Sequence, residues 1–533
     1  EIAEAMTAPQ RVDKLALGPG RSSSLLPSEP RDVVVIGAGL CGLVAARAAR
    51  KAGLSVAVLE RRQIVGGVWT SFANSTSQVN SSEGGYCTKA LGDVVHTANR
   101  DHSPTYEVVA DLKALVEVVG AENIFTGVDV MKVFESTVLV RQVDVGELCR
   151  GATSFAGAAT LEARRGVVVA VNDRVGVPRP LCYDGRAAFE AAGGVVARGL
   201  SDDLADYDWR GKKVVIVGFG AFAVENARTA LEHGAASVVV LARRVGTVCP
   251  KVIDYLNFVK PFDDDLSNHD ATTNVKQMRQ WQKLYAASGA AVPECWPTQI
   301  KHQGHTISVS DVWFVAHHLG KLSTKIGQVA SLRAGGVVLA SHAEEFVPCD
   351  VVVACIGFER NTRLCADLTG ASTVKQSNYV TPRCMYLADA EIDDGAFNYF
   401  FGSSVLEYAK FFAEVFVLAA RDDAPPGLRE DLLAFPEVPI DDRKWSHSIT
   451  AARRLIKNYP AVRAIAQRQV TDRTRHFWAS LPPATWVQAN RQEWAELHDR
   501  LNGGVPVPPS ARLPYFFDDA PAWCGPAPAT YHD

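Results

Sequence analysis

The run Val33-Val34-Val35-Ile36-Gly37-Ala38-Gly39-Leu40-Cys41-Gly42 decides the fold. Its first four residues are apolar and β-branched, which is typical of a central strand in a parallel sheet. A Gly-x-Gly-x-x-Gly pattern follows at once, and residues 43–52 are rich in helix-forming Ala and Arg, with Gly53 as the cap. Residues 55–59 are again mostly apolar and extended in character. The stretch therefore predicts a strand–helix–strand unit.

Each glycine of this pattern has a mechanical purpose. Gly37 makes a tight turn, Gly39 lets the backbone approach a pyrophosphate, and Gly42 allows the helix to pack closely on the strand. The pyrophosphate then lies at the helix N-terminus, where backbone N–H groups have no partner within the helix. Glu60 follows Gly39 by 21 residues, at the end of the second strand, where an acid binds ribose hydroxyls. The unit is therefore expected to bind a dinucleotide.

The same pattern returns 181 residues downstream. Residues 214–217 predict a strand, and Gly218-Phe-Gly220-Ala-Phe-Ala223 follows, with Ala223 as an accepted replacement for the third glycine. Residues 224–233 are predicted to be helical, and residues 237–241 to form the next strand. Two dinucleotide folds are therefore expected, with no finer repeat.

The second unit lacks the ribose-binding acid. The position that corresponds to Glu60 is Leu241, and Arg243 and Arg244 follow directly. The loss of a carboxylate and the gain of two guanidinium groups favour a 2′-phosphate, hence NADP(H) over NAD(H). The alternative is a solvated basic pair at a strand end.

Two dinucleotide sites imply two cofactors in electronic contact. The usual pairing is FAD in the first fold and NADPH in the second. The chain has 11 cysteines but no Cys-x-x-Cys, so a dithiol relay, a disulfide framework and a zinc ribbon are not expected, and no metal site is predicted. Electrons that reach the flavin must then pass to O₂, to a separate acceptor or to a bound organic substrate.

Length and composition describe an ordinary folded protein. The 533 residues are 47% hydrophobic and 21% charged, with a net charge of -4, which argues against disorder and does not favour nucleic acid as a partner. No stretch approaches the roughly 20 apolar residues of a membrane span. The expected setting is intracellular and cytoplasmic, although a chain that opens on Glu1 leaves a processed leader and organellar import open.

The predicted fold class is α/β, with an FAD domain into which an NADPH domain is inserted. We expect five segments: a flexible arm at 1–30, the first part of the FAD domain at 31–207, the NADP-binding domain with a helical insertion at 208–345, the second part of the FAD domain at 346–430, and a helical, Pro-rich extension at 431–533. Within them, residues 106–119 predict a helix, 124–143 a hairpin and 397–420 an aromatic-rich helix.

Four further motifs share one family resemblance. Residues 58–69, Val-Leu-Glu-Arg-Arg-Gln-Ile-Val-Gly-Gly-Val-Trp, contain a Glu followed by Gly-Gly-x-Trp, and residues 74–77 read Asn-Ser-Thr-Ser. Residues 241–246 place an Arg pair before a glycine, and residues 355–358, Cys-Ile-Gly-Phe, end a strand. From about residue 32 to about residue 420, this order and spacing resemble the flavin-containing monooxygenases of the class B flavoprotein monooxygenase superfamily.

The resemblance implies the cofactor-binding residues and a reaction. FAD would be held by Gly37, Gly39, Gly42, Glu60, Arg61, Gly67, Val68 and Trp69, and NADPH by Gly218, Gly220, Ala223, Arg243, Arg244 and Gly357. In this family NADPH reduces the flavin, O₂ adds to it as a C4a-hydroperoxide, and a small nitrogen, sulfur or carbonyl compound is oxygenated. Asn74 is the implied catalytic residue at the flavin edge, and an Asx turn is the alternative interpretation of the same side chain.

Two departures from the family keep other functions open. The family fingerprint Phe-x-Gly-x-x-x-His has its nearest match at residues 189–194, and no His follows before Gly218. Residues 169–173 replace the first Ala-Thr-Gly linker. A flavin-dependent NADPH oxidase without substrate oxygenation is therefore one alternative, and a flavin-binding regulatory protein without turnover is another. The expected partners are a small substrate and O₂, and homo-oligomerisation is left open.

Overall fold

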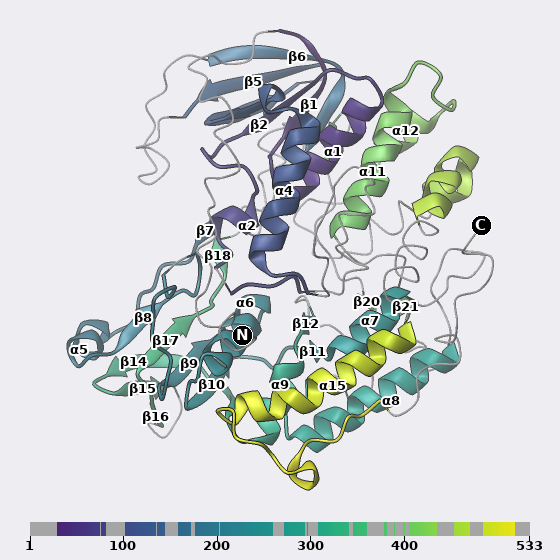
Figure 1. The fold of residues 1–533 in the computed structure, drawn as a ribbon. Coiled ribbons are helices and arrows are strands. Elements are labelled where there is room, and N and C mark those ends of the chain that lie inside the picture. Colours follow the sequence, from purple (N-terminus) through teal and green to yellow (C-terminus); the bar gives the residue numbers. More distant parts are fainter. Residues whose placement is uncertain are drawn as a thin grey trace.

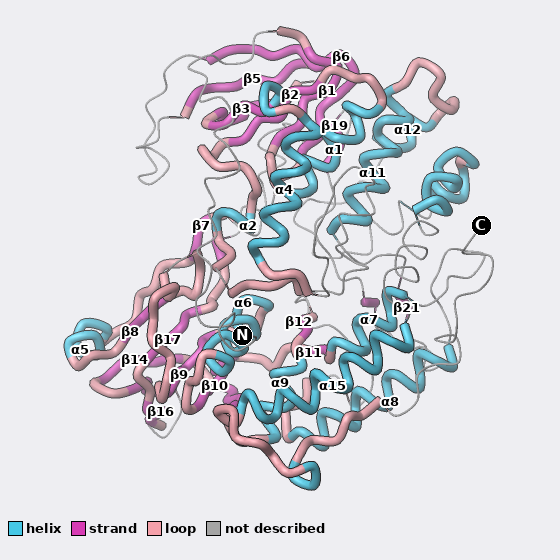
Figure 2. Tube along the Cα trace, viewed as in Figure 1, coloured by secondary structure: helices cyan, strands magenta, loops and turns pink. Residues whose placement is uncertain are grey.

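The computed structural model describes residues 29–74, 76–80, 102–134, 136–143, 158–171, 176–201, 203–259, 271–293, 296, 307–340, 345–359, 378–380, 388–389, 398–399, 405–433, 452, 454–469 and 483–517. Two sheet-containing units and a layer of helices make up this part of the chain (Figure 1). The first unit lies at the top of the view, and the second sheet lies at the lower left beside the helical layer (Figure 2).

The first unit is built on a seven-stranded sheet in the order β3-β2-β1-β6-β5-β4, with β19 also paired to β6. Its strands are β1 (Arg31–Ile36), β2 (Val56–Glu60), β3 (Ile124–Thr126), β4 (Val128–Val133), β5 (Thr137–Gln142), β6 (Ala158–Val169) and β19 (Asn378–Val380). The pairs that involve β1, and the β2–β3 and β6–β19 pairs, are parallel, whereas β4–β5 and β5–β6 are antiparallel. The predicted hairpin thus corresponds to β4 and β5, whereas β3, at the start of the predicted range, belongs to the parallel part of the sheet.

Both faces of β1 are covered, which explains its uninterrupted apolar sequence. On one face lie α1 (Leu40–Lys51), α4 (Thr105–Val119), α11 (Val405–Ala420) and α12 (Leu428–Leu433), whose core includes Leu43, Leu112 and Phe411. Val34 and Ile36 point to the other face, where they pack against the β4–β5 hairpin. The helix predicted at residues 106–119 is confirmed. The helix predicted at 397–420 is confirmed only from Val405, because Asn398 and Tyr399 form the short strand β21; the other residues of 397–404 lie outside the described residues.

The second unit is a five-stranded parallel sheet in the order β13-β10-β9-β17-β8. Its strands are β8 (Val195–Ala197), β9 (Lys213–Val217), β10 (Ser237–Ala242), β13 (Leu322–Ile326) and β17 (Val351–Ala354). Helix α6 (Ala221–Glu232) covers one face, and α5 (Arg186–Ala191) with the small sheet of β14 (Val329–Arg333), β15 (Gly336–Leu339) and β16 (Phe346–Pro348) covers the other. Because β8 and β17 belong to this sheet, the unit extends beyond the predicted range 208–345 at both ends.

Two short strands mark the crossings between the units. β7 (Val177–Pro178) leads from the first unit into the second, β18 (Phe358–Glu359) leads back, and the two pair antiparallel. Phe358 also makes an edge contact with Phe72 of the first unit, with ring centroids 4.8 Å apart. The second unit is therefore an insertion into the first, as predicted, held by a two-stranded connection.

The C-terminal extension packs onto the inserted unit. Its helix α15 (Pro483–Leu501) lies beside α7 (Lys251–Val259) and α9 (Asp311–His318), and α8 (Ala271–Ser288) packs against α9, in the lower part of the view (Figure 1). Trp486 stacks on Tyr255 at a centroid distance of 3.9 Å, and Lys251 pairs with Glu493 at 3.0 Å. The predicted helical insertion and extension thus form one helical layer. None of the described helices is long and apolar enough to cross a membrane.

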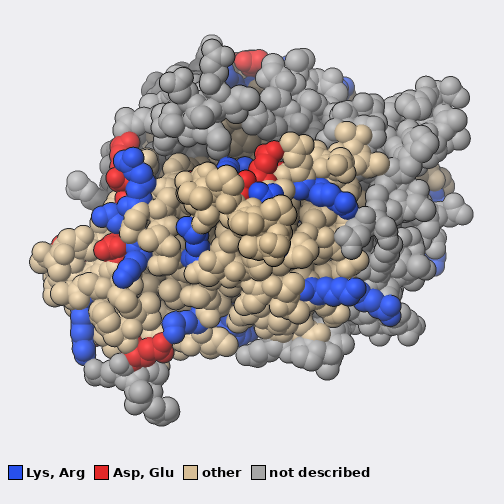
Figure 3. All heavy atoms as spheres, turned by 60° about the horizontal axis from the view of Figure 1, so that its bottom comes forward, with Lys and Arg blue, Asp and Glu red and all other residues tan. Residues whose placement is uncertain are grey.

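The remaining described elements are short. They are α2 (Val68–Ser71), η4 (Ala121–Asn123), η5 (Pro509–Ala511), β11 (Val248–Cys249), β12 (Ser308–Val309), β20 (Ala388–Asp389) and β21 (Asn398–Tyr399). On the face that Figure 3 brings forward, the charged side chains of the described residues are scattered rather than gathered in one patch. The predicted arm at 1–30 falls almost wholly outside the described residues.

Candidate functional site

The first glycine turn has the geometry that a dinucleotide fold requires. Gly37 has φ +100°, and a Cβ on Gly42 would lie 1.9 Å from the Gly37 carbonyl oxygen, so no side chain fits between strand β1 and helix α1. Gly39 is the N-cap of α1 and makes no side-chain cap, and the first turn of α1 carries no acidic residue. The N–H groups at this end of α1 are therefore directed toward a site that suits a phosphate.

The Gly-Gly-x-Trp segment lies against this turn. Gly66 N–H donates to the Ala38 carbonyl at 2.9 Å, and a Cβ on Gly67, which has φ +62°, would lie only 3.0 Å from Gly39 Cα. Val68 and Trp69 then begin the short helix α2, and Trp69 packs against the core of α1. The sequence-predicted residues Gly39, Gly67, Val68 and Trp69 are therefore close in space.

Glu60 stands at the end of β2 with its carboxylate turned toward the glycine turn. One oxygen accepts from Ala38 N–H and the other from Arg62 N–H, each at 2.9 Å. Burial raises the pKa of Glu60, although these two bonds favour the charged form. Each oxygen keeps a lone pair beyond these bonds, so the carboxylate suits ribose hydroxyls. Arg61 is exposed next to it.

Glu60→Gln is expected to weaken FAD binding about 10- to 100-fold, because a hydrogen bond to a charged group contributes about 1.5–3 kcal/mol. In the wild type the raised pKa of Glu60 moves its protonation above the usual 4.5. As pH falls through that pKa, the carboxyl becomes protonated and loses acceptor capacity, so we expect FAD to be released. Over the same pH range the free energy of unfolding rises, because a raised folded-state pKa favours the protonated form.

The measurement is FAD fluorescence on dilution between pH 4 and pH 8, approximate limits that bracket the carboxyl titration. The Gln variant should bind FAD weakly at every pH and should show no further loss of FAD as the pH falls. An equal loss of FAD at low pH in the variant would show that a group other than Glu60 causes the release.

The second glycine turn matches the first. Gly218 has φ +121°, and its Cβ would lie 2.3 Å from the Cys355 carbonyl oxygen at the end of β17. Gly220 is the uncapped N-cap of α6, and a Cβ there would meet no atom within 4 Å. Ala223 is fully buried against the sheet. The open space above Gly220 is where a nucleotide pyrophosphate would fit.

The two arginines follow β10 at the same edge of the sheet. Arg243 and Arg244 are both exposed, directly after the strand that pairs with β9. Gly357 is also exposed, with φ +80°, and its carbonyl accepts from Arg179 N–H at 3.2 Å in the connection between the units. The two arginines thus lie at the sheet edge that carries the second glycine turn. Gly357 lies in the connection between the two units, just before β18.

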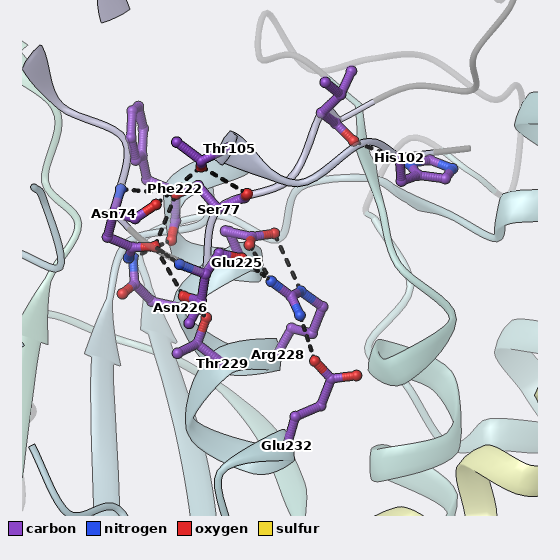
Figure 4. Close-up of polar contacts among 12 residues, drawn as sticks. Asn74, Ser77, His102, Thr105, Phe222, Glu225, Asn226, Arg228, Thr229 and Glu232 are labelled. Carbon is purple, nitrogen blue, oxygen red and sulfur yellow. Dashed lines mark hydrogen bonds and ion pairs between the residues drawn. The ribbon is translucent and has the colours of Figure 1, made fainter. Parts of the chain in front are cut away.

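Asn74 is held by its own loop. Its Oδ1 accepts from Thr76 N–H at 3.0 Å, from Thr76 Oγ1 at 2.8 Å and from Ser77 Oγ at 3.0 Å. Its Nδ2 donates to the Gly199 carbonyl at 3.4 Å. The Asx-type turn weighed from the sequence is therefore present, and the amide of Asn74 points to the linker between β8 and β9 (Figure 4).

That linker holds residues that sequence reasoning missed. Asp203 accepts through Oδ2 from the N–H groups of Arg198 and Gly199, at 2.7 and 3.1 Å, and burial raises the pKa of Asp203. Asp203 follows Gly199 by four residues, the Gly-to-His spacing of the family fingerprint, whereas the earlier match lies in α5, where Phe189 is buried. The sequence signal that could have found this segment is the four-residue spacing from Gly199 to Asp203, shortly before β9.

Two weaker candidates have ordinary structural roles. His317 places Nδ1 2.7 Å from the Trp313 carbonyl and Nε2 3.2 Å from Thr324 Oγ1, and His318 Nε2 lies 3.0 Å from the Ala511 carbonyl. Cys249 is buried, which raises the pKa of its thiol. Both ring nitrogens of His317 are therefore engaged by groups of the protein, and His318 is engaged through Nε2.

Comparisons with families and sequences of known proteins find short matches, and the family match lies in the first unit. Residues 35–99 match the family of NAD(P)-binding Rossmann-like domains. Flavin-containing monooxygenase FMO GS-OX-like 2 of Arabidopsis thaliana is 57% identical over 53 residues, which are 10% of this chain and 10% of that protein. Putative flavin-containing monooxygenase FMO GS-OX-like 11 of the same plant is 56% identical over 46 residues, 9% of this chain and 27% of that protein. The chain matches only a small part of each relative's length.

Solved structures extend the likeness to most of the chain. An oxidized steroid monooxygenase bound to NADP superposes with a TM-score of 0.54 at 14% identity, covering 82% of this chain and 98% of that one. OTEMO in complex with FAD and NADP superposes with a TM-score of 0.51 at 14% identity, covering 74% and 86%. These identities establish the fold alone. The predicted fold class and the resemblance to flavin-containing monooxygenases are confirmed.

Proposed function

We propose that this chain, whose first nucleotide unit is that of a flavin-containing monooxygenase, is an FAD- and NADPH-dependent monooxygenase. The observation that carries the proposal is the pair of glycine turns, each at an uncapped helix N-terminus with no acidic residue in the first helical turn. A bound flavin supplies the chemistry of accepting a hydride from NADPH and passing electrons to O₂. The expected substrate is a small nitrogen, sulfur or carbonyl compound.

The first turn supplies the FAD-binding groups of this chain. The residues that would hold the cofactor are Gly37, Gly39, Gly42, Glu60, Arg61, Gly67, Val68 and Trp69. Backbone N–H groups at Gly39 and beyond suit the pyrophosphate, and the Glu60 carboxylate suits the ribose hydroxyls. The Gly66–Gly67 backbone lies against the Gly39 turn beside these groups.

The second turn and the end of β10 supply the proposed NADPH-binding groups Gly218, Gly220, Ala223, Arg243 and Arg244, and the crossing between the units supplies Gly357. The exposed guanidinium groups suit the 2′-phosphate, since arginine pairs with phosphate through charge-assisted bonds. Asn74, at the junction, is proposed to orient groups near the flavin edge through its amide.

The Arg243→Ala/Arg244→Ala double variant is expected to raise KM for NADPH at least about 10- to 100-fold and to leave KM for NADH within about twofold, because even one charge-assisted bond contributes about 1.5–3 kcal/mol. Steady-state kinetics with both nucleotides measure this. Arg210→Ala is the control, because Arg210 is exposed on the same unit and its guanidinium pairs with the neighbouring Asp208. Equal losses for NADPH and NADH would assign the pair a role other than phosphate recognition.

The reaction itself is tested by coupling. NADPH consumption, peroxide release and product formation are measured together on the FAD-loaded full chain with panels of amines, sulfides and ketones. The proposal expects at least one compound for which oxygenated product accounts for most of the NADPH consumed. Quantitative peroxide release with every compound would replace the proposal by its alternative.

That alternative is a flavin-dependent NADPH oxidase. Asp203 favours it, because a carboxylate fixed to two backbone N–H groups occupies the fingerprint spacing where relatives carry a histidine. In the coupling experiment an oxidase forms peroxide in proportion to NADPH, whatever compound is added.

A further inference from the structure

Helix α6 holds the Asn74 loop along one of its sides (Figure 4). Thr229 Oγ1 lies 2.8 Å from Thr76 Oγ1, and Arg228 donates through Nη2 to the Thr76 carbonyl. Gln78 contributes a backbone hydrogen bond to Glu225. The loop that carries Asn74 in the first unit is therefore bound by a helix of the second unit.

Arg228 is the central group of this contact. Its side chain is only 13% exposed and forms ion pairs with Glu225 and Glu232, one turn to either side on α6. Burial opposes the charge, but the two carboxylates outweigh it and raise the pKa of Arg228. The guanidinium is therefore charged and fixed in direction, which makes its bond to the Thr76 carbonyl a charge-assisted one.

Asn226 binds the linker from the same helix. Its Nδ2 donates to the Gly199 carbonyl at 3.2 Å and to the Phe222 carbonyl at 2.8 Å. Asn74 donates to the same Gly199 carbonyl from the first unit. A Cβ on Gly199 would lie 2.4 Å from Asn226 Oδ1, so the approach of the two asparagines requires a glycine.

The linker is fixed on its other side as well. Ser201 has φ +52°, unusual for a residue with a side chain, and its N–H and Oγ donate to the Phe72 and Ser71 carbonyls at 2.8 and 2.6 Å. Because α2 lies directly beyond the Gly67 turn, Ser201 ties the linker to the FAD side. The Gly199 carbonyl, which accepts hydrogen bonds from Asn74 and Asn226, is thus one of the points where the two units meet.

We propose that Asn226 and Arg228 are positioning residues that set, from the NADPH side, the place of Asn74 and the approach of the two nucleotide sites. This inference rests on the proposed function. Both side chains project from α6, whose N-terminal end is the pyrophosphate-binding turn; a 12-residue helix is about 18 Å long. One rigid element therefore carries both the nucleotide contact and the contact with the Asn74 loop.

The test compares Asn226→Ala and Arg228→Met with wild type in anaerobic mixing with NADPH. Because misplacement of a reacting pair by about 1 Å costs about 100-fold, flavin reduction should slow by about 10- to 100-fold. FAD content and the Kd of NADP⁺ should change less than about threefold, since neither side chain belongs to the proposed nucleotide contacts. Arg228→Lys should restore part of the rate by returning a charged donor.

The matched control is Arg500→Met. Arg500 projects from α15 and pairs with Glu232 at 3.6 Å, and within the described part of the chain it makes no hydrogen bond or ion pair with the Asn74 loop, so its loss should leave reduction near the wild-type rate. Hydrogen exchange adds a readout that does not need turnover. The Gly199 N–H should exchange at least about tenfold faster in Asn226→Ala and at the wild-type rate in Arg500→Met.

The proposal is overturned if folded Asn226→Ala and Arg228→Met reduce flavin within about twofold of the wild type, or if Gly199 exchange does not change. If Arg228→Met does not fold, Asn226→Ala decides by the same criteria. A wild type that binds no FAD would contradict the proposed function instead, and the exchange measurement would still report on the junction.

Discussion

Gly42→Ala is expected to abolish FAD binding and to destabilise the first unit by about 3 kcal/mol or more, at or beyond the upper end of ordinary overpacking. The added Cβ would lie 1.9 Å from the Gly37 carbonyl oxygen and 3.0 Å from its carbon, so backbone rather than a flexible side chain must move. Relief requires helix α1 to lift from β1, and this opens the pyrophosphate turn.

Thermal unfolding and the FAD content of the purified variant measure this effect. Gly176→Ala is the control, because a Cβ there meets no atom within 4 Å and the backbone is not left-handed. It should keep the wild-type Tm and FAD content. A Gly42→Ala protein with full FAD and an unchanged Tm would show that strand and helix do not pack as closely as described.

Gly220→Ala, unlike Gly42→Ala, is expected to impair NADPH binding without lowering stability. The backbone at Gly220 has φ −98°, which alanine adopts freely, and its Cβ would meet no protein atom within 4 Å. Stability and FAD content should therefore remain near wild type. The methyl group would occupy the space proposed for the pyrophosphate, so KM for NADPH should rise about 100-fold, the equivalent of about 2.7 kcal/mol.

The matched control for Gly220→Ala is Ala227→Gly. Ala227 is buried on the same helix and is not one of the proposed nucleotide contacts, so the glycine should lower stability by about 1 kcal/mol and leave KM for NADPH unchanged. Steady-state kinetics and thermal unfolding separate the two effects. An unchanged KM in Gly220→Ala would place the nucleotide elsewhere.

The parts of the fold with strong local patterns could be predicted from the sequence. The apolar runs that became β1 and β9, the glycines that follow them, and Glu60 at the end of β2 all lie within short stretches. In such stretches residue type alone defines backbone geometry. The helix at 105–119 could be predicted for the same reason, from its spacing of Val and Leu.

Features that depend on distant partners could not be predicted. β8 is a three-residue strand whose pairing with β17 joins residues about 150 positions apart, and nothing local indicates which sheet it enters. Arg228, read alone, is a surface residue of an amphipathic helix. It is buried because the Asn74 loop covers it, and that contact follows only from the packing of two units.

The most direct measurement is anaerobic titration of the FAD-reconstituted full chain with NADPH and, separately, NADH. The account predicts about one FAD per chain, since a single glycine turn is followed by the ribose acid, and bleaching of the flavin absorbance by NADPH at concentrations well below those of NADH. A chain that takes up no flavin, or whose bound flavin neither nucleotide bleaches, would contradict it.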